Sequence, residues 1–483
     1  MVKFKKIINK KFVNVSEEVK ASVAYTICGV LTKCLSLITL PIFTRILTTE
    51  EYGLSTVYSS TVSVVIIFVS LQLAYGSLST AMIKYDNDRK GYLSSICGLV
   101  TCLTCVYIIF SFANKKTLVD FLEIPFGLIV LMGLEALFST IRDIWMSGER
   151  FEYNYKGVVF VTLITSILSV AISFLAVFFF KEKGLAKIFA NAVVVFVVGS
   201  ILYIIILKKG RRFFYKEYWK FALTFNIPLI PYYLSQMIFN QSDRLMINKI
   251  CGMSDAALYG VAYSLATILT FVVVSINNSY VPWIFERIKR NELGNNKIVT
   301  LYLSLGIAFM LLGIIALTPE IVYVMAGEKY MSAIYVVPPV TMSVLLLYYA
   351  DLFDCFLFFF ECKFLLSISA IVSALLNIIL NYIFIPKFGF LAAGYTTLFS
   401  YFALALIDYV FMKYILKAKN IKSDVYNIKG LIIVYLSFML LGFTAMALYS
   451  YPIVRYFIII IVLIMVFIFR KRFIKIFNEM KGV

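Results

Sequence analysis

The sequence predicts an all-α protein that crosses a membrane many times. Hydrophobic residues make up 62% of the 483 residues and charged residues only 15%, whereas soluble domains hold about 45–50% apolar and roughly 25% charged residues. The mean hydropathy is +0.92. Apolar segments of about 20 residues, long enough to span the ~30 Å hydrocarbon core as a helix, recur along the whole chain.

Fourteen such segments can be distinguished, separated by loops of at most about 16 residues. Their centres lie near residues 33, 67, 101, 132, 168, 197, 235, 270, 307, 346, 374, 401, 439 and 461. We therefore expect about 14 transmembrane helices with no soluble domain inserted between them.

The basic residues support this topology and orient it. If the N-terminus is cytoplasmic, 33 of the 45 Lys and Arg residues fall in cytoplasmic loops or tails, Arg142 among them, and 10 in external loops. Cytoplasmic loops carry such an excess, so both termini are expected in the cytoplasm. The net charge of +19 then requires no nucleic-acid partner. The N-terminal stretch KFKKIINKKF would lie on anionic headgroups, or serve only as a topology anchor.

Several kinds of chemistry are disfavoured. The chain has no histidine, which removes imidazole bases and histidine-ligated metals. Cys102 and Cys105 form a CxxC inside an apolar segment, where small buried hydrophobes are the ordinary interpretation. A membrane polymerase or glycosyltransferase needs a catalytic loop outside the bilayer, and none is long enough. We therefore expect that the protein is not an enzyme and uses no cofactor. A proton or a sodium ion could bind as a coupling ion.

Two weak matches indicate an internal repeat. Tyr52-Gly53 in TTEEYGLSTVYSS matches Tyr259-Gly260 in MSDAALYGVAYSL at an offset of 207, and Gly184 matches Gly389 at an offset of 205. Two matches at nearly one offset predict two parallel six-helix halves around a central cavity, an arrangement that places substrate between the halves. The predicted parts are residues 1–210, 211–420 and 421–483, the last with spans 13 and 14 and a basic tail.

Two basic residues, Lys33 and Arg244, remain after all others are assigned to loops. Lys33 lies ~18 Å along a helix from Arg45, near the bilayer centre, where a cation costs about 2.5–3.5 kcal/mol by insertion scales. Arg244 maps by the repeat offset onto position 37, one turn from Lys33. Since residues four apart share a helix face, we expect both cations to face one cavity, although a purely structural salt bridge is the alternative for Lys33.

Other polar residues accompany these cations. Tyr233, Gln236 and Asn240 form a stripe with Arg244 at three- and four-residue spacing, which favours a hydrated cavity over packing alone. Asp243 is a further candidate for the substrate site, and it could instead reach Lys33 across the halves. The remaining candidates are acids in spans 4 and 10 that could bind a coupling ion, or else pair with nearby cations: Glu135, Asp351 and Asp354. Asp408 is expected near the membrane interface, close to Lys413.

The stretch LPIFTRILTTEEYG, with Pro41, Thr44-Arg45 and Tyr52-Gly53, resembles the signature of Wzx-type polysaccharide flippases. These belong to the multidrug/oligosaccharidyl-lipid/polysaccharide superfamily. SDR…YG, from Ser242 to Gly260, resembles the second-half counterpart. Span count, parallel halves and short loops fit over essentially the whole chain.

The resemblance implies a flippase in the bacterial cytoplasmic membrane. It would move undecaprenyl-diphosphate-linked oligosaccharide, for O-antigen or capsule, from the inner to the outer leaflet by alternating access. In relatives, cavity Arg and Lys residues engage the diphosphate, and Lys33 and Arg244 match that role here. Expected partners are the lipid-linked substrate, the bilayer, a polysaccharide polymerase and a chain-length regulator. The alternative is an ion-coupled drug or small-molecule exporter of the same superfamily, in which cavity carboxylates should dominate.

Overall fold

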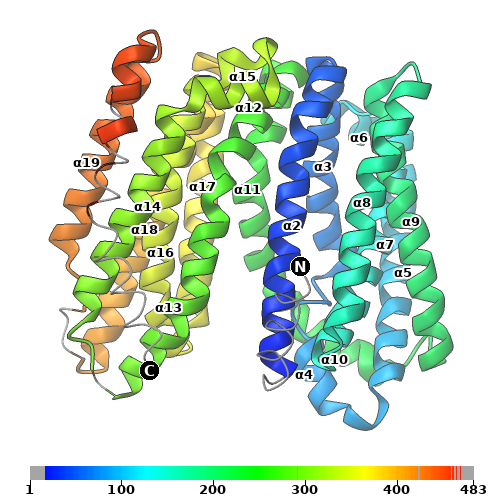
Figure 1. Ribbon diagram of the computed structural model, residues 1–483. Coiled ribbons are helices and arrows are strands. Elements are labelled where there is room, and N and C mark those ends of the chain that lie inside the picture. Colours follow the sequence, from blue (N-terminus) through cyan, green and yellow to red (C-terminus); the bar gives the residue numbers. More distant parts are fainter. Residues whose placement is uncertain are drawn as a thin grey trace, which may run out of the picture. The chain divides into compact units, whose positions relative to one another are not determined.

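The computed structural model describes residues 17–290, 292–421, 425–457, 459–461, 464 and 468. These residues form helices and connecting turns without a strand (Figure 1). Eleven of the described helices are long and apolar enough to cross a membrane, or up to 12 if the bent pair α6–α7 counts as one span. The predicted all-α membrane architecture is confirmed. The fourteenth predicted span lies partly outside the described residues, and the basic N-terminal stretch lies wholly outside them.

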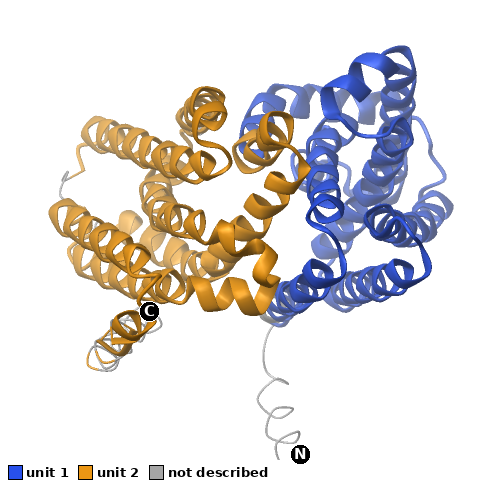
Figure 2. Cartoon of the chain, turned by 90° about the horizontal axis from the view of Figure 1, so that it is seen from above, with its two compact units in different colours: residues 1–237 blue, residues 238–483 orange. Residues whose placement is uncertain are grey.

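The chain divides into two compact units, residues 1–237 and 238–483 (Figure 2). The predicted division into repeats at residues 210 and 420 stays a prediction, since compactness does not define repeats. The helices of unit 1 are α2 (Glu17–Ile46), α3 (Thr49–Ser70), α4 (Leu78–Lys84), η1 (Asp86–Asp88), α5 (Arg89–Ala113), α6 (Lys115–Leu122), α7 (Phe126–Phe151), α8 (Tyr155–Phe179), α9 (Lys183–Gly210), α10 (Lys216–Asn226) and η2 (Ile227–Leu229). Helix α11 (Ile230–Cys251) contains the boundary between the units.

Unit 2 is built around α16, which is 72% buried over its most apolar 18 residues and packs against α12, α13, α14, α17, α18 and α19. The helices of unit 2 are α12 (Met253–Ala266), η3 (Thr267–Leu269), α13 (Thr270–Arg290), α14 (Asn296–Ala316), α15 (Thr318–Ala326), η4 (Glu328–Tyr335), α16 (Val337–Phe359), α17 (Lys363–Phe388), α18 (Leu391–Ala418) and α19 (Ile428–Ala447).

The second predicted span is interrupted between α3 and α4. Leu71 and Gln72 have φ angles of 45° and 53°, a left-handed conformation that L-residues with a Cβ adopt rarely. A Cβ on Gly76 would lie 2.0 Å from Oδ1 of Asn226, and the Asn226 amide donates to Ser77 Oγ at 2.6 Å. The end of α10 is therefore seated directly on this break.

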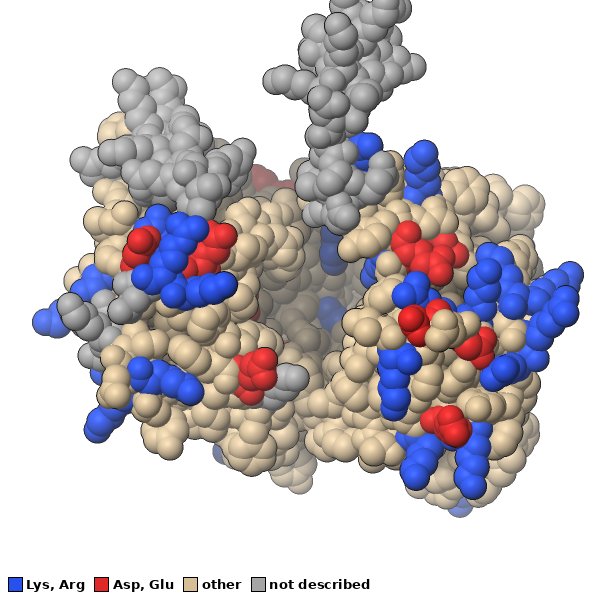
Figure 3. Space-filling view, turned by 90° about the horizontal axis from the view of Figure 1, so that it is seen from below, with Lys and Arg blue, Asp and Glu red and all other residues tan. Residues whose placement is uncertain are grey.

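Helix α10 is fixed to unit 1 along its length. Tyr218 donates to Asp88 at 2.8 Å and the Trp219 indole to the Ser95 carbonyl at 2.9 Å. Burial, together with the Asp88 carboxylate, raises the pKa of Tyr218 to about 12. The exposed basic side chains at this end of unit 1 gather on its surface (Figure 3), and they are Lys84, Lys90, Lys208, Lys209, Arg211, Arg212, Lys216 and Lys220.

The two segments that define the repeat touch each other within each unit. Thr48 and Glu51 form a capping box at the start of α3, and the free carboxylate oxygen of Glu51 accepts from the Lys183 amide at 3.1 Å. In unit 2, the hydroxyls of Tyr259 and Thr397 lie 3.5 Å apart. The two segments of the predicted repeat therefore contact each other in both units, through Glu51 and Lys183 in unit 1 and through Tyr259 and Thr397 in unit 2.

The segment after α19 is fastened to α15 by an ion pair. The Arg455 guanidinium is 2% exposed and donates to Oε1 of Glu320, and Tyr456 donates to the same oxygen at 2.9 Å. Two tyrosine rings flank the guanidinium, with centroids 5.7 Å and 5.6 Å from its carbon atom. The last described part of the chain is therefore tied to unit 2 by charge as well as by apolar packing.

Close packing of α7 against α9 allows a direct stability test. A Cβ on Gly199 would lie 2.5 Å from the Cβ and 2.8 Å from the backbone oxygen of Phe138. We expect Gly199→Ala to lower stability by about 1–3 kcal/mol, the usual range for overpacking, measured as thermal unfolding in detergent. Gly313→Ala on α14 is the matched control, because no atom lies within 4 Å of its Cβ position. Equal stabilities of the two variants would contradict the model of the α7–α9 interface.

Candidate functional site

Lys33 lies on an exposed face of α2, in the middle of a candidate membrane span. Gly29 and Ser36, part of the thin polar stripe predicted around it, are also exposed. Among the described residues, no ion pair or side-chain hydrogen bond of Lys33 is recorded, while its carbonyl accepts from Ser36 Oγ at 2.8 Å. Within unit 1 the ammonium is therefore available to a ligand.

Arg244 lies on α11, where its guanidinium is held at two points. One terminal nitrogen donates to Gln241 Oε1 at 2.7 Å, and the guanidinium carbon stands 4.7 Å from the ring centroid of Tyr263. Its Nε is buried without a hydrogen-bond partner. The side chain is thus oriented by its neighbours while it keeps unused donor capacity, and guanidinium donors suit phosphate oxygens.

The predicted polar stripe makes α11 unusual among the long helices. Gln236 and Asn240 are exposed, and Tyr233 is partly buried. Among the described residues, α11 is a 22-residue helix that is not apolar enough to be recognised as a candidate span by composition. A helix of this composition in a membrane protein needs a polar environment along one face.

Asp243 is the centre of a buried cluster in unit 2. Its side chain is 2% exposed. Tyr259 donates to Oδ2, Thr397 donates to Oδ2 at 2.7 Å, and the Asn381 amide donates to Oδ1 at 2.6 Å. Both oxygens thus accept from donors of α12, α17 and α18 inside unit 2, and the suggested contact with Lys33 stays a prediction.

Glu135 on α7 is the centre of a polar cluster in unit 1. The Tyr58 hydroxyl of α3 donates to Oε2 at 2.8 Å, and the Asn191 amide of α9 donates to Oε1 at 3.1 Å. Asn191 in turn accepts from Ser169 of α8 at 2.9 Å. Four helices of unit 1 therefore meet at one carboxyl group.

The acids of span 10 lie inside unit 2. Asp351 on α16 accepts from the Asn277 amide of α13 at 2.7 Å. Asp354 follows one turn later, and Asp408 on α18 is 0% exposed. Helix α18 continues ten residues beyond Asp408 to Ala418, and the expectation that Asp408 lies near the membrane interface stays a prediction.

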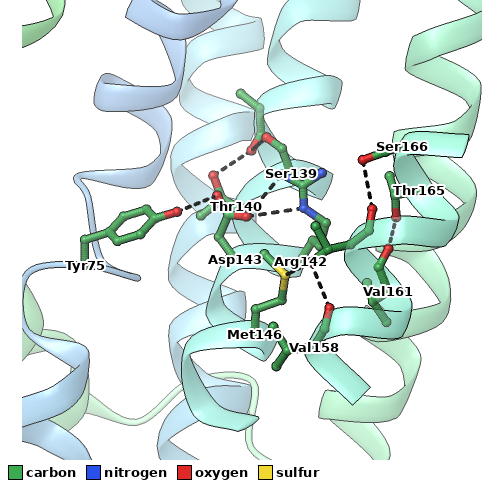
Figure 4. Close-up of polar contacts among 12 residues, drawn as sticks. Tyr75, Ser139, Thr140, Arg142, Asp143, Met146, Val158, Val161, Thr165 and Ser166 are labelled. Atoms are coloured by element: carbon green, nitrogen blue, oxygen red, sulfur yellow. Dashed lines mark hydrogen bonds and ion pairs between the residues drawn. The ribbon is translucent and has the colours of Figure 1, made fainter. Parts of the chain in front are cut away.

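Arg142 is a further charged residue inside a helix, and its predicted place in a cytoplasmic loop is wrong. It lies within α7, which runs on to Phe151. Its guanidinium donates to Oδ1 of Asp143 at 3.1 Å, and Tyr75, from the break after α3, donates to Oδ2 at 3.4 Å (Figure 4). The cluster joins the interrupted span to α7.

Sequence reasoning found the acids but not their partners. Asn377 and Asn381 of α17 belong to the Asp243 cluster, and each is 0% exposed. The sequence does contain a pattern that could have identified these partners. Four polar residues recur at intervals of four in an apolar segment, namely Ser369, Ser373, Asn377 and Asn381. Such spacing places them on one helix face. Over the described residues, no group of three or more His, Cys, Asp or Glu side chains is arranged to hold a metal ion.

Comparison with known proteins gives a family and a fold. The family model described as polysaccharide biosynthesis protein matches residues 19–288. An uncharacterized membrane protein of Haemophilus influenzae is 23% identical over 290 residues, 57% of this chain and 67% of that protein. The Lsg locus putative protein 1 of the same organism is 23% identical over 291 residues, with the same shares covered.

Solved structures with the same fold come from transporters and flippases. The lipid II flippase MurJ in an inward closed conformation has a TM-score of 0.70 at 14% identity, covering 93% of this chain and 100% of that chain. An inward-facing MATE family multidrug resistance transporter of the MOP superfamily has a TM-score of 0.61 at 11% identity, covering 80% and 95%.

The Asp243 cluster predicts a stability effect separate from transport. We expect Asp243→Asn to lower stability by about 1–3 kcal/mol, the cost of leaving a buried donor unsatisfied, because the new amide nitrogen meets donors rather than acceptors. Thermal unfolding of Asp243→Asn, Tyr259→Phe and the double variant measures it. The two effects should be strongly non-additive. Simple additivity, or an unchanged unfolding temperature in Asp243→Asn, would contradict the assigned hydrogen bonds.

Proposed function

Because the chain belongs to the polysaccharide biosynthesis protein family, we propose that it flips undecaprenyl-diphosphate-linked oligosaccharide across the bacterial cytoplasmic membrane. Movement would run from the inner to the outer leaflet by alternating access, for synthesis of O-antigen or capsule. The family match over residues 19–288 supports a role in polysaccharide biosynthesis, and the fold is that of membrane transporters and flippases. A flippase needs no catalytic residue, since no bond is made or broken.

The observation that carries this proposal is the pair of cations in membrane helices, Lys33 in unit 1 and Arg244 in unit 2. A diphosphate has to cross a region of low dielectric, and fixed positive charges offset the cost of removing it from water. Lys33 has no recorded ion pair among the described residues, and Arg244 keeps a buried nitrogen without a partner. Arginine suits bidentate phosphate contacts, and lysine acts as a point charge.

The polar face of α11 suits the sugar part of the same substrate. Tyr232 and Tyr233 have ring centroids 5.5 Å apart, and Gln236 and Asn240 follow on the same helix. Sugars present apolar faces and hydroxyl groups, so aromatic rings together with amides can bind them. We assign these residues and Arg244 to substrate binding, and Asp243 to holding α11 in position beside them.

An ion-coupled exporter of drugs or small molecules is the second candidate, supported by the likeness in fold to the MATE transporter. Cationic drugs would be bound by carboxylates. Asp243, the carboxylate beside Arg244, is instead 2% exposed and occupied by donors of unit 2. This arrangement favours an anionic substrate over a cationic one.

Coupling to a proton or sodium ion would drive net movement. The candidates are Glu135 in unit 1 and Asp351 and Asp354 in unit 2, all carboxyl groups inside membrane helices. Intramembrane acids of transporters commonly serve as ion sites. A polysaccharide polymerase and a chain-length regulator are the proposed protein partners, and both termini are proposed to lie in the cytoplasm.

Removing either cation should slow transport strongly. We expect Lys33→Ala and Arg244→Ala to slow translocation of lipid-linked oligosaccharide in proteoliposomes by about tenfold to a hundredfold, since a hydrogen bond to a charged group contributes about 1.5–3 kcal/mol. In cells, lipid-linked repeat units should accumulate in the inner leaflet while surface polysaccharide disappears.

The control is Lys116→Ala, which removes an exposed lysine of α6 outside the proposed site. It should transport at the normal rate. Insertion of every variant is checked by membrane fractionation. Normal surface polymer in the Lys33→Ala, Arg244→Ala double variant would remove the diphosphate role, and transport of cationic drugs without lipid-linked substrate would favour the exporter.

The coupling residues are tested with imposed gradients. Translocation is measured in vesicles with a proton or a sodium gradient, using Glu135→Gln and Asp351→Asn. We expect the variant of a coupling residue to lose its response to the gradient while downhill movement continues, because binding of the driving ion is lost but the substrate path is intact. A full response in both variants would exclude these two residues.

A further inference from the structure

Asp354 and Asp408 are two carboxyl groups inside unit 2 that the proposed substrate site does not use. Asp354 lies on α16 and Asp408 on α18, two helices packed against each other. The side chains are within hydrogen-bonding reach of one another. Asp408 is 0% exposed, so water does not solvate its charge.

Neither group is supplied with donors as a carboxylate would require. Both oxygens of Asp408 and Oδ1 of Asp354 are buried without a hydrogen-bond partner. Ser369 of α17 lies beside Asp408, but its hydroxyl donates to the Leu366 carbonyl at 3.0 Å. This contrasts with Asp243 and Glu135, whose oxygens all accept from named donors.

The surrounding charges do not compensate the pair. The next group acting on both carboxyls is Asp351, one turn earlier on α16, whose own oxygen accepts from Asn277 of α13. On α18, the Lys413 ammonium stands 5.2 Å from the ring centroid of Tyr409. The ion pairs in the described part of unit 2 join Arg287 to Glu292, Arg290 to Glu286 and Arg455 to Glu320, so none of them includes Asp354 or Asp408.

Two carboxylates in contact, buried and without cations, repel each other strongly. One proton removes the repulsion and supplies the missing donor, because a protonated carboxyl donates a hydrogen bond to its neighbour. The proton then belongs to the pair rather than to either residue. A single shared proton is therefore the smallest ligand that satisfies this site.

A polar row on α17 connects the pair to the rest of the interior of unit 2. Ser369, Ser373, Asn377 and Asn381 follow at four-residue intervals, each at most 2% exposed. Ser373 Oγ and Asn377 Nδ2 are buried without a partner. Hydroxyl and amide groups with unused hydrogen-bonding capacity provide the polar surroundings through which a proton can leave a buried site.

We propose that Asp354 and Asp408 form a proton-binding site in unit 2 that holds one shared proton. The proton is bound and released during the cycle, and its role as the driving ion rests on the proposed transport function. The site is distinct from the Asp243 cluster, which is saturated with donors.

The shared proton can be observed directly by infrared spectroscopy of the full-length protein in lipid. Labelling aspartate carboxyl groups with ¹³C separates them from Glu135. We expect Asp354→Asn and Asp408→Asn each to remove one protonated-carboxyl signal at neutral pH, and the double variant to remove no more than either single variant. Retention of the signal in both single variants would overturn the site, as would loss of two signals in the double variant.

Asp88→Asn is the matched control, because the Asp88 carboxyl forms a 3.1 Å ion pair with Arg212, so no protonated-carboxyl signal should be lost. Asparagine is isosteric with aspartate and removes an uncompensated charge, so both variants should fold. Should one not fold, the other reports on the same proton. Thermal unfolding temperatures measured in NaCl and in choline chloride show whether a sodium ion, rather than a proton, binds to the pair. A sodium-dependent shift that Asp408→Asn removes would overturn the proton in favour of sodium.

Transport measurements separate the site from the function. A shared proton together with gradient-driven translocation that Asp408→Asn abolishes supports both. A shared proton in a protein that does not move lipid-linked oligosaccharide supports the site and overturns the proposed function. Unchanged gradient-driven translocation in Asp408→Asn overturns the driving role of the pair.

Discussion

A polar group inside a membrane-spanning bundle has to find its partner within the protein, and this constraint organises both units. The hydrocarbon core offers no water to hydrogen-bond, so an unmet group costs several kcal/mol. Glu135 draws donors from α3 and α9, and Asp243 from α12, α17 and α18. Each carboxyl thereby specifies which helices meet in its unit, a directional requirement that apolar packing alone does not impose.

The same constraint explains why the fold was predictable from the sequence while the site was only partly so. Apolar length and the positions of basic residues determine the spans, and these signals are local. The partners of Asp243 lie 16 to 154 residues away from it, and no local pattern pairs them. Arg142 was misplaced because a charge near the end of an apolar segment is typical of a loop. Helix α7 instead extends past it, and the Arg142 guanidinium donates to Asp143, which also accepts from Tyr75.

The two segments of the predicted repeat contact each other within each unit. TTEEYG begins α3 and packs on the start of α9 through Glu51 and Lys183, while Tyr259 meets Thr397 in unit 2. Tyr259 also donates to Asp243, the neighbour of Arg244, so this segment packs directly beside the proposed substrate site.

The ion pair between Arg455 and Glu320 has a consequence for how the protein is made. The two residues are separated by 135 positions, so α15 is synthesised long before its cation. Until Arg455 arrives, the Glu320 carboxylate, with one oxygen enclosed by the fold, has no countercharge. The contact between α15 and the segment that carries Arg455 can therefore form only after that segment has been synthesised, so α15 gains this ion pair later than its contacts with earlier helices.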